Sequence, residues 1–180
     1  LSTPVDKPFN DKNWDFEIKW DGVRAILFYH KSKNILELKS RTNKSIIHRY
    51  PEIVDSLVSS SILNCDDSIV LDGEIVILNE QGHPDFQSHQ RRMNIDKALD
   101  IQYLSKEIPS TFYVFDILYL DGRSLESLEF SERRGLLSSV LDTSQDGDKV
   151  IRISESFETK GVELFENIRA LKLEGIIAKN

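Results

Sequence analysis

Short apolar segments of strand length, separated by turns, recur along this 180-residue chain and constrain its fold more than any other feature. Between Trp14 and Trp20 apolar and charged residues alternate, which is the period of a half-buried β-strand. The segments 23–29 and 35–39 flank the turn-like stretch 31–34, so we expect a β-hairpin there. Further strands are predicted at 68–78, 111–120, 150–154 and 175–179.

Helices are fewer than strands. Pro51 suits a first helical position, and apolar residues follow it with helical spacing at 53, 54, 57 and 58. Residues 86–92 form a second predicted helix.

Two more helices are expected towards the end of the chain, and Ser131 is the expected N-cap of the first. Their predicted inward residues are Leu136, Leu137 and Val140 in the first, and Val162, Phe165, Ile168 and Leu171 in the second. Because locally paired strands are mixed with helices, we predict an α+β fold with mainly antiparallel sheets and flanking helices. No repeat or flexible linker divides the chain, so we expect one domain.

Composition excludes several classes of protein. Hydrophobic residues make up 39% and charged residues 29% of the chain, as in globular rather than disordered proteins. No apolar run approaches the length of a bilayer span, and no signal peptide opens the chain, so we expect an intracellular protein without a membrane anchor. The single cysteine, Cys65, is expected to be an ordinary half-buried thiol, and the four histidines lack the spacing of metal ligands.

Charge is distributed unevenly. The net charge is −7, yet residues 1–50 contain 10 basic and 6 acidic side chains. A local basic surface can bind phosphates on an acidic protein, so net charge does not exclude nucleic acid as a partner.

The most specific motif is Glu17-Ile18-Lys19-Trp20-Asp21-Gly22-Val23-Arg24. Strand alternation places Glu17, Lys19 and Asp21 on one face. The glycine that follows allows the backbone to approach a ligand closely. An amine, a carboxylate and a guanidinium can together hold a nucleotide, although a solvated strand edge is the alternative interpretation.

This segment resembles motif I of the covalent nucleotidyltransferases, which comprise ATP-dependent DNA ligases, RNA ligases and mRNA capping enzymes. Other segments resemble the remaining motifs in order: Ser40-Arg41 after the hairpin, 71–74 for motif III, 113–116 with 120–122 for motif IIIa, and 174–179 for motif IV. The sequences of residues 86–92 and 115–122 are most similar to those of the ligase domain of prokaryotic end-joining ligases of the LigD type. The resemblance implies an ATP-grasp-like nucleotidyltransferase (adenylation) domain over residues 1–180.

The resemblance implies a reaction in which the Lys19 amine attacks the α-phosphorus of ATP and forms lysyl-AMP. Adenylate then passes to a 5′-phosphate at a nick or break in DNA, and the adjacent 3′-hydroxyl displaces AMP. Such chemistry serves DNA repair and end joining.

The implied roles of the other residues follow from the same resemblance. Glu17 would accept a hydrogen bond from the adenine amino group, and Arg24 and Arg41 would contact ribose or phosphate. Glu74 and Glu174 would lie near a divalent ion, Mg²⁺ or Mn²⁺. The remaining two roles are stacking of Phe115 on adenine and approach of Lys179 to the α-phosphate.

Two of these assignments conflict with simple strand geometry. Phe115 shares parity with Tyr113, Ile117 and Tyr119, so it could equally belong to a core stripe. Lys179 faces away from Glu174 along an ideal strand, so either Glu174 precedes the strand or one of the two roles is wrong.

The implied partner is nicked or broken duplex DNA, bound without sequence preference. Candidate contacts are two basic clusters, Arg41, Lys44, His48 and Arg49, and Arg91 with Arg92. Because the chain stops after the motif IV match, we expect a domain truncated before motif V, without the C-terminal OB-fold domain of the full protein, and a monomer.

Three alternatives remain open from sequence. They are an RNA ligase, a capping-type guanylyltransferase and a non-catalytic module that binds nucleotide or DNA.

Overall fold

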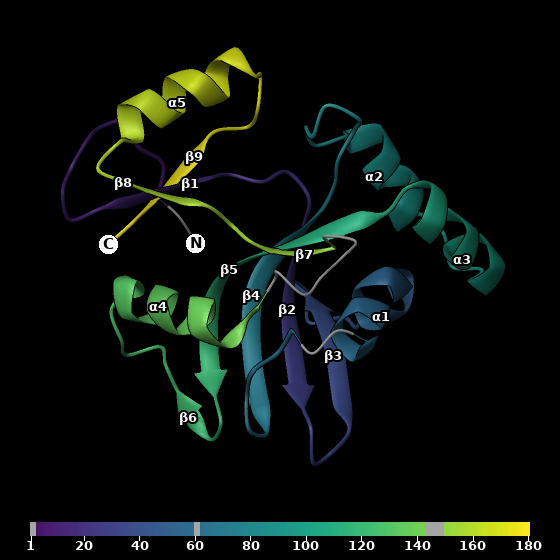
Figure 1. Ribbon diagram of the computed structural model, residues 1–180. Helices are drawn as coiled ribbons and strands as arrows, with labels where there is room; N and C mark the ends of the chain where they lie inside the picture. The colour runs from purple at the N-terminus through teal and green to yellow at the C-terminus, as the bar shows by residue number, and fades with distance from the viewer. Residues whose placement is uncertain (1–2, 60–61, 143–149) are drawn as a thin grey trace. The chain divides into compact units, whose positions relative to one another are not determined.

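The computed structural model describes residues 3–59, 62–142 and 150–180 (Figure 1). The chain forms two compact units, one of Leu1–Asp21 with Ser154–Asn180 and one of Gly22–Ile153. Each unit combines a sheet with at least one helix, and the strands pair antiparallel except for β7 beside β5. The predicted α+β class is therefore confirmed.

The larger unit is built on one six-stranded sheet. Its main strand order is β3-β2-β4-β5-β6, and β7 pairs with β5 outside this path. The strands are β2 (Val23–His30), β3 (Ile35–Ser40), β4 (Ser68–Ile77), β5 (Ser110–Leu120), β6 (Arg123–Ser124) and β7 (Ile151–Ile153). The strands that the sequence predicted in this unit are confirmed, and each of their ends lies within a residue or two of its predicted position.

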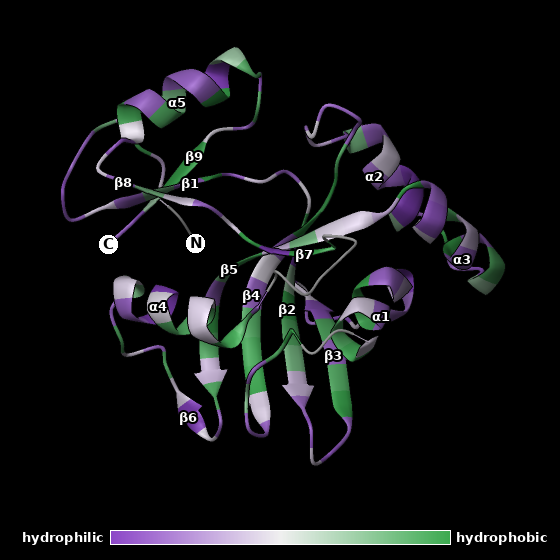
Figure 2. Cartoon of the chain, viewed as in Figure 1, coloured by the Kyte–Doolittle hydropathy of each residue, from purple (hydrophilic) through white to green (hydrophobic). Residues whose placement is uncertain are grey.

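The β2–β3 hairpin shows why the alternation predicted strands. Ala25 and Leu27 of β2 and Leu38 of β3 are buried in the main core. The alternate residues of each strand point to the other face of the sheet. The turn contains Asn34 at φ 52°, a left-handed conformation that asparagine tolerates. Figure 2 shows that hydrophobic residues concentrate in β2 to β5.

Two helices contribute to the core of this sheet. Helix α1 (Pro51–Ser59) buries Ile53 and Leu57, and helix α4 (Phe130–Val140) buries Leu137 and Val140. The predicted α1 stripe was too wide, because Val58 is 75% exposed.

The predicted start of α4 was wrong by two residues. Glu129 is the N-cap, and its backbone N–H donates to the Glu132 carboxylate at 3.1 Å. Ser131 therefore lies inside the first turn. A glutamate in that turn satisfies an N–H group that would otherwise lack a partner.

Two further helices join β4 to β5, and a short 3-10 turn, η1 (Ile47–Arg49), precedes α1. Helix α2 (Phe86–Met93) matches the prediction, and the Asp85 carboxylate caps it by accepting from the backbone N–H groups of Gln87 and Ser88. Helix α3 (Ala98–Glu107) was not predicted. Few of its apolar residues are buried, so its sequence lacks the apolar stripe by which the other helices were predicted. Figure 2 shows long hydrophilic stretches on both helices.

The smaller unit has a three-stranded sheet of order β8-β1-β9 and one helix. Its elements are β1 (Asp15–Ile18), β8 (Ser156–Glu158), α5 (Gly161–Ala170) and β9 (Ile176–Lys179). Phe16, Leu164 and Ile168 form its core.

The predicted face of α5 was wrong in part. Val162 and Leu171 are 37% and 48% exposed, whereas the buried pair is Leu164 and Ile168. A spacing of three drifts around a helix of 3.6 residues per turn, while a spacing of four stays on one face.

Among the described residues, no helix has the length and apolar character needed to cross a bilayer.

Candidate active site

In the smaller unit, Lys19 and Glu174 lie side by side, one just after the end of a strand and the other just before the start of another. Lys19 directly follows β1, and its backbone N–H donates to the Gly175 carbonyl at 2.9 Å. Glu174 lies before β9, and its carboxylate forms an ion pair with the Lys19 ammonium. The two side chains are 40% and 41% exposed, so both the amine and the carboxylate are open to solvent.

Gly175 explains how Glu174 reaches this position. Its φ of 154° is a conformation that residues with side chains rarely adopt, and it turns the chain immediately before β9. Of the two possibilities left by strand parity, the structure therefore has Glu174 preceding the strand.

Glu17 and Lys179 form the second charged pair of this unit. The Lys179 Nζ lies 2.9 Å from the Glu17 Oε2, and the Glu17 residue is only 2% exposed. A buried carboxylate requires a charged or hydrogen-bonding partner. The alternative of a solvated strand edge is therefore wrong for Glu17, which is buried and bound to Lys179.

In the larger unit, Arg24 is bound to Asp72 across strands β2 and β4. Its Nε and Nη2 donate to the two carboxylate oxygens at 3.0 and 2.5 Å, and Asp72 is 3% exposed. The hydrogen bonds that Arg24 donates to Asp72 raise the pKa of its guanidinium against the opposing effect of burial, with smaller contributions from Glu74 and Asp116. Arg24 also lies 5.9 Å from the centroid of the Phe115 ring, within cation–π range.

Glu74 is beside Arg24 because the two residues are directly paired in the β2–β4 register. Gly22 makes this approach possible, since a Cβ there would collide with the backbone carbonyl of Ile75. Sequence reasoning assigned this glycine to the approach of a ligand, whereas in the structure it permits contact between two strands.

Phe115 occupies an irregular point in β5. Val114 pairs with Gly73 and Asp116 with Asp72, so Phe115 is an extra residue in the ladder, as in a β-bulge. Tyr113 pairs with Glu74, while Ile117 pairs with Leu71 and is in the main core. The alternative of a single core stripe of equal parity is therefore wrong, because the bulge puts Tyr113 and Ile117 on opposite faces.

Arg133 of α4 is a residue that sequence reasoning missed. It binds Asp116, the neighbour of Phe115, through Nε at 2.7 Å and Nη2 at 2.8 Å, and donates to the Leu128 carbonyl at 2.6 Å. This contact joins α4 to β5 across 17 positions of the sequence, so no local motif indicated it.

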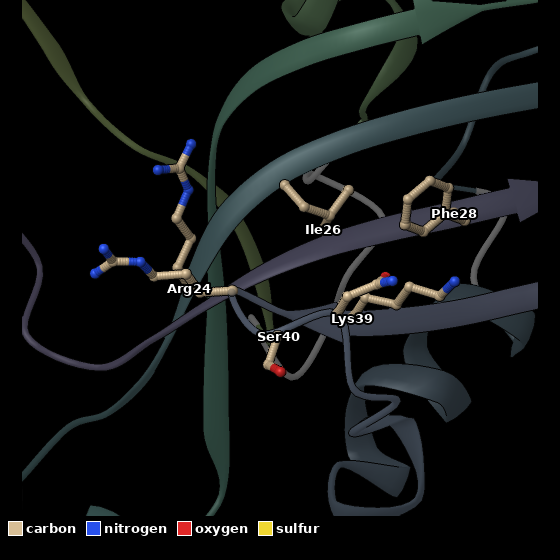
Figure 3. A pocket seen from close by; sticks show the side chains of 7 residues that line it. Arg24, Ile26, Phe28, Lys39 and Ser40 are labelled. Atoms are coloured by element: carbon tan, nitrogen blue, oxygen red, sulfur yellow. The ribbon is translucent and has the colours of Figure 1, made fainter. Parts of the chain in front are cut away.

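Arg41 is presented by a tight turn at the end of β3. The Ser40 N–H donates to the Lys44 carbonyl at 2.9 Å, and the Asn43 N–H donates to the Ser40 carbonyl at 2.8 Å. Asn43 has φ 59°, which closes the turn. Arg41 and Arg24 line one pocket on this face, together with Ile26, Phe28 and Lys39 (Figure 3).

The two predicted basic clusters differ in accessibility. Arg92 is 1% exposed and donates to the carbonyls of Arg49, Leu104 and Ile108, so its predicted role in contacting DNA was wrong. The neighbouring Arg91 is exposed.

Arg49 also has protein partners, since its guanidinium donates to the Met93 carbonyl and to Asp96. Arg41, Lys44 and His48 are exposed.

Cys65 is half-buried, as the sequence predicted. Burial raises the pKa of its thiol, and Asp121 adds to that rise.

Comparison with known proteins decides the family. The sequence model of the "ATP dependent DNA ligase domain" matches residues 3–180. This chain belongs to the ATP-dependent DNA ligase family. That family corresponds to the first of the interpretations considered from sequence and not to an RNA ligase or a capping enzyme.

Two relatives place this ligase-family chain more closely. It is 33% identical over 177 residues to the SPbeta prophage-derived DNA ligase-like protein LigB of Bacillus subtilis, covering 97% of this chain and 57% of that protein. It is 32% identical to the multifunctional non-homologous end joining protein LigD of Mycolicibacterium smegmatis, covering 95% of this chain and 19% of LigD. The chain therefore spans between a fifth and three fifths of the length of these relatives.

Solved structures agree with this assignment. The mycobacterial DNA ligase D complexed with ATP and MES superposes with a TM-score of 0.69 at 28% identity, over 95% of this chain and 49% of that one. The ligase domain of LigD from M. tuberculosis gives a TM-score of 0.67 at 27% identity, over 95% of this chain and 48% of that one. The predicted nucleotidyltransferase fold of DNA ligases is thus confirmed.

Proposed function

We propose that this chain is the adenylation domain of an ATP-dependent DNA ligase and that Lys19 is its nucleophile. The amine nitrogen bonds to the α-phosphorus of ATP, the bond to pyrophosphate breaks, and the amine loses a proton. AMP is then transferred to a 5′-phosphate in DNA, and attack by the 3′-hydroxyl releases it as the strand is sealed.

The position of Lys19 beside Glu174 is the observation that carries this proposal. The ion pair holds an accessible amine at the end of a strand, next to a carboxylate from the opposite end of the chain. The lone pair of the amine must point at the α-phosphorus to form the new bond, so binding of the nucleotide must separate Lys19 from Glu174 before the first step.

The other pair of the smaller unit is suited to recognising adenine. We propose that Glu17 accepts a hydrogen bond from the adenine amino group and that Lys179 donates to the α-phosphate. The Lys179 ammonium lies 2.9 Å from Glu17 and holds that carboxylate in one orientation. A carboxylate accepts from an amino group and would repel the carbonyl oxygen of guanine, which favours ATP over GTP.

In the larger unit, we propose that Phe115 stacks on adenine and that Glu74 contacts ribose. Arg24 and Arg41 contact ribose or phosphate oxygens. Arg24 is oriented by two hydrogen bonds to Asp72, which suits a guanidinium that must present its remaining N–H groups in one direction.

Glu74 and Glu174 are the proposed ligands of Mg²⁺ or Mn²⁺. No group of three or more histidine, cysteine or acidic side chains that could bind a metal occurs among the residues that the structure describes. Mg²⁺ usually binds through one or two carboxylates together with substrate phosphates, so a single carboxylate, that of Glu74 or of Glu174, is enough for an ion that arrives with ATP. When bound, the ion would neutralise charge on the phosphates.

The proposed DNA partner is a nicked or broken duplex bound without sequence preference, as sealing requires. We also propose a C-terminal OB-fold domain in the full protein and a monomeric state. The names of the LigD relatives point to end joining as the setting.

The test is self-adenylation. The chain, alone and joined to an OB-fold domain, is incubated with Mg²⁺ and ATP labelled at the α-phosphate, and protein-bound label is measured. We expect label on wild type and on Lys12→Ala, an exposed lysine of the same unit, and none on Lys19→Ala.

Label that survives in Lys19→Ala would exclude Lys19 as the nucleophile. Wild type whose mass is unchanged by ATP in both forms would instead support the non-catalytic module.

A further inference from the structure

Ser156 is the polar neighbour of Glu17 in the sheet of the smaller unit. Glu17 lies in the central strand β1 and is paired directly with Ser156 of β8 on one side and with Ile177 of β9 on the other. In antiparallel strands, the side chains of directly paired residues lie on the same face, with their Cβ atoms about 4.5–5.5 Å apart. A serine hydroxyl turns between three rotamers and a glutamate side chain spans such a gap, so the two side chains can form a hydrogen bond.

The Ser156 hydroxyl is buried but unused. Its Oγ has almost no contact with solvent and has no hydrogen-bond partner among the residues that the structure describes. The large majority of buried polar side-chain atoms in proteins are hydrogen-bonded, so each exception needs a physical explanation. A donor without a partner in the free chain is available to a group that loses its own donor in another state.

Glu17 is such a group. Its charged donor in the free chain is Lys179, whose Nζ lies 2.9 Å from the Glu17 Oε2. The same ammonium is proposed above to donate to the α-phosphate of ATP. The Lys179 side chain is 20% exposed and that of Glu17 only 3%, so the lysine can turn towards a phosphate while the carboxylate stays buried. A buried carboxylate then requires another donor.

We propose that Ser156 is a positioning residue for adenine recognition, which donates its hydroxyl hydrogen to Glu17 once Lys179 has turned to the phosphate. The inference rests on the roles proposed above for Glu17 and Lys179. The exchange of donors keeps the Glu17 carboxylate in one orientation, in which it accepts a hydrogen bond from the adenine amino group.

The exchange also strengthens the choice of nucleotide. An ammonium beside Glu17 offsets the negative charge that repels the carbonyl oxygen of guanine, whereas a hydroxyl carries no net charge. With Ser156 as the donor, the carboxylate keeps its full charge while it contacts the base. Ser156 therefore acts on the preference for ATP over GTP and not on the reacting atoms.

The first experiment measures self-adenylation of the chain, alone and joined to an OB-fold domain, over a range of concentrations of ATP or GTP labelled at the α-phosphate. For Ser156→Ala we expect the half-saturating ATP concentration to rise about tenfold, because a hydrogen bond to a charged group is lost. The maximal rate should change by less than about twofold, since the interaction contributes equally before and during the chemical step. The preference for ATP over GTP should fall about tenfold.

Three further variants accompany this measurement. Ser156→Thr retains the hydroxyl and suits a strand, so it should restore the wild-type preference. Ser138→Ala is the control for chemistry, because it removes an exposed serine hydroxyl from α4. Glu158→Gln is the control for position, because it alters an exposed residue two places along β8 on the same face. Both controls should keep the wild-type preference and half-saturating concentration.

The second experiment is a double-mutant cycle on the free chain, measured by thermal unfolding without nucleotide. In the wild-type background, Ser156→Ala removes a hydroxyl that has no partner, so Tm should change by less than about 1 °C. Lys179→Met removes the charged donor, and Ser156 then takes its place beside Glu17. In that background, Ser156→Ala should lower Tm by about 5 °C.

The proposal is overturned if Ser156→Ala keeps the wild-type preference for ATP, or if Ser156→Thr is folded and behaves like the alanine variant. It is also overturned if Ser156→Ala changes Tm equally with and without Lys179, because the hydroxyl then acts independently of that lysine. The cycle needs no nucleotide, so it tests the exchange of donors separately from the proposed function. A chain that labels at Lys19 but shows no coupling in the cycle overturns this inference alone.

Discussion

Arg133 holds Asp116 by two parallel hydrogen bonds, with its Nε 2.7 Å from Oδ1 and its Nη2 2.8 Å from Oδ2. The same Oδ1 accepts the backbone N–H of Ile117 at 2.9 Å. The carboxylate thus joins helix α4 to the irregular part of β5 that contains Phe115. These hydrogen bonds raise the pKa of the Arg133 guanidinium despite its burial.

We expect Arg133→Gln to destabilise the chain by about 2–3 kcal/mol, because a mostly buried carboxylate loses its charged donors. Urea unfolding measures the change in the free energy of unfolding. Arg123→Gln, at an exposed arginine of β6, should change it by less than about 0.5 kcal/mol. Equal losses in the two variants would show that the pair contributes little.

Arg24→Ala should lower the free energy of unfolding by about 1–3 kcal/mol, even though the Arg24 side chain is 45% exposed. The cost arises because Asp72, with its side chain 4% exposed, is left buried without its charged partner. Adding Asp72→Asn removes that charge, so the double variant should be more stable than Arg24→Ala. A double variant that is less stable than the single one would contradict this cause.

Tyr50 makes stability dependent on pH at the alkaline end. Burial raises the pKa of its hydroxyl from 10.0 to about 12, against the opposing effect of Arg92. The unfolded chain therefore ionises first, and stability present below pH 10 is lost as the pH rises towards 12. By linkage, two pKa units correspond to about 3 kcal/mol.

The measurement is the free energy of unfolding between pH 8 and 12. Tyr50→Phe should remove this part of the decline, whereas Tyr103→Phe, at a residue 63% exposed, should retain it. Parallel curves for wild type and Tyr50→Phe would exclude Tyr50 as the cause.

Arg91 and Arg92 are adjacent but should respond in opposite ways to alanine. Arg92 bridges α1, α2 and α3 through carbonyl groups and through Glu52, whose carboxylate lies 3.0 Å away. We expect Arg92→Ala to cost about 3–5 kcal/mol and to leave the charge available to DNA unchanged. Arg91→Ala should be nearly neutral for stability, and the reverse order would contradict the burial of Arg92.

Sequence reasoning identified most of this fold because alternation and core burial coincide in its strands. Ala25 and Leu27 show the agreement, since both lie in a predicted strand and both are buried on its core face. The motifs assigned Lys19 and Glu174 to one nucleotide site, and the structure brings the two side chains into an ion pair although 154 residues separate them.

The failures have physical causes. Parity arguments assume an unbroken ladder, and the bulge at Phe115 invalidates them for Tyr113 and Ile117. Arginine is normally a surface residue, so nothing local indicates that Arg92 fills the interior between three helices. The partnership of Arg133 with Asp116 depends on tertiary packing, which no periodicity records.

Strand β1 lies between β8 and β9, and both of these partners come from the last quarter of the chain. On a ribosome, residues 15–18 emerge well before residues 156–158 and 176–179, so β1 must wait for both of its neighbours. Closing such a long loop is slow compared with forming the β2–β3 hairpin. The nascent chain therefore exposes Lys19 without its carboxylate neighbour until Glu174 has been made, and the order of synthesis delays assembly of the reactive amine's surroundings.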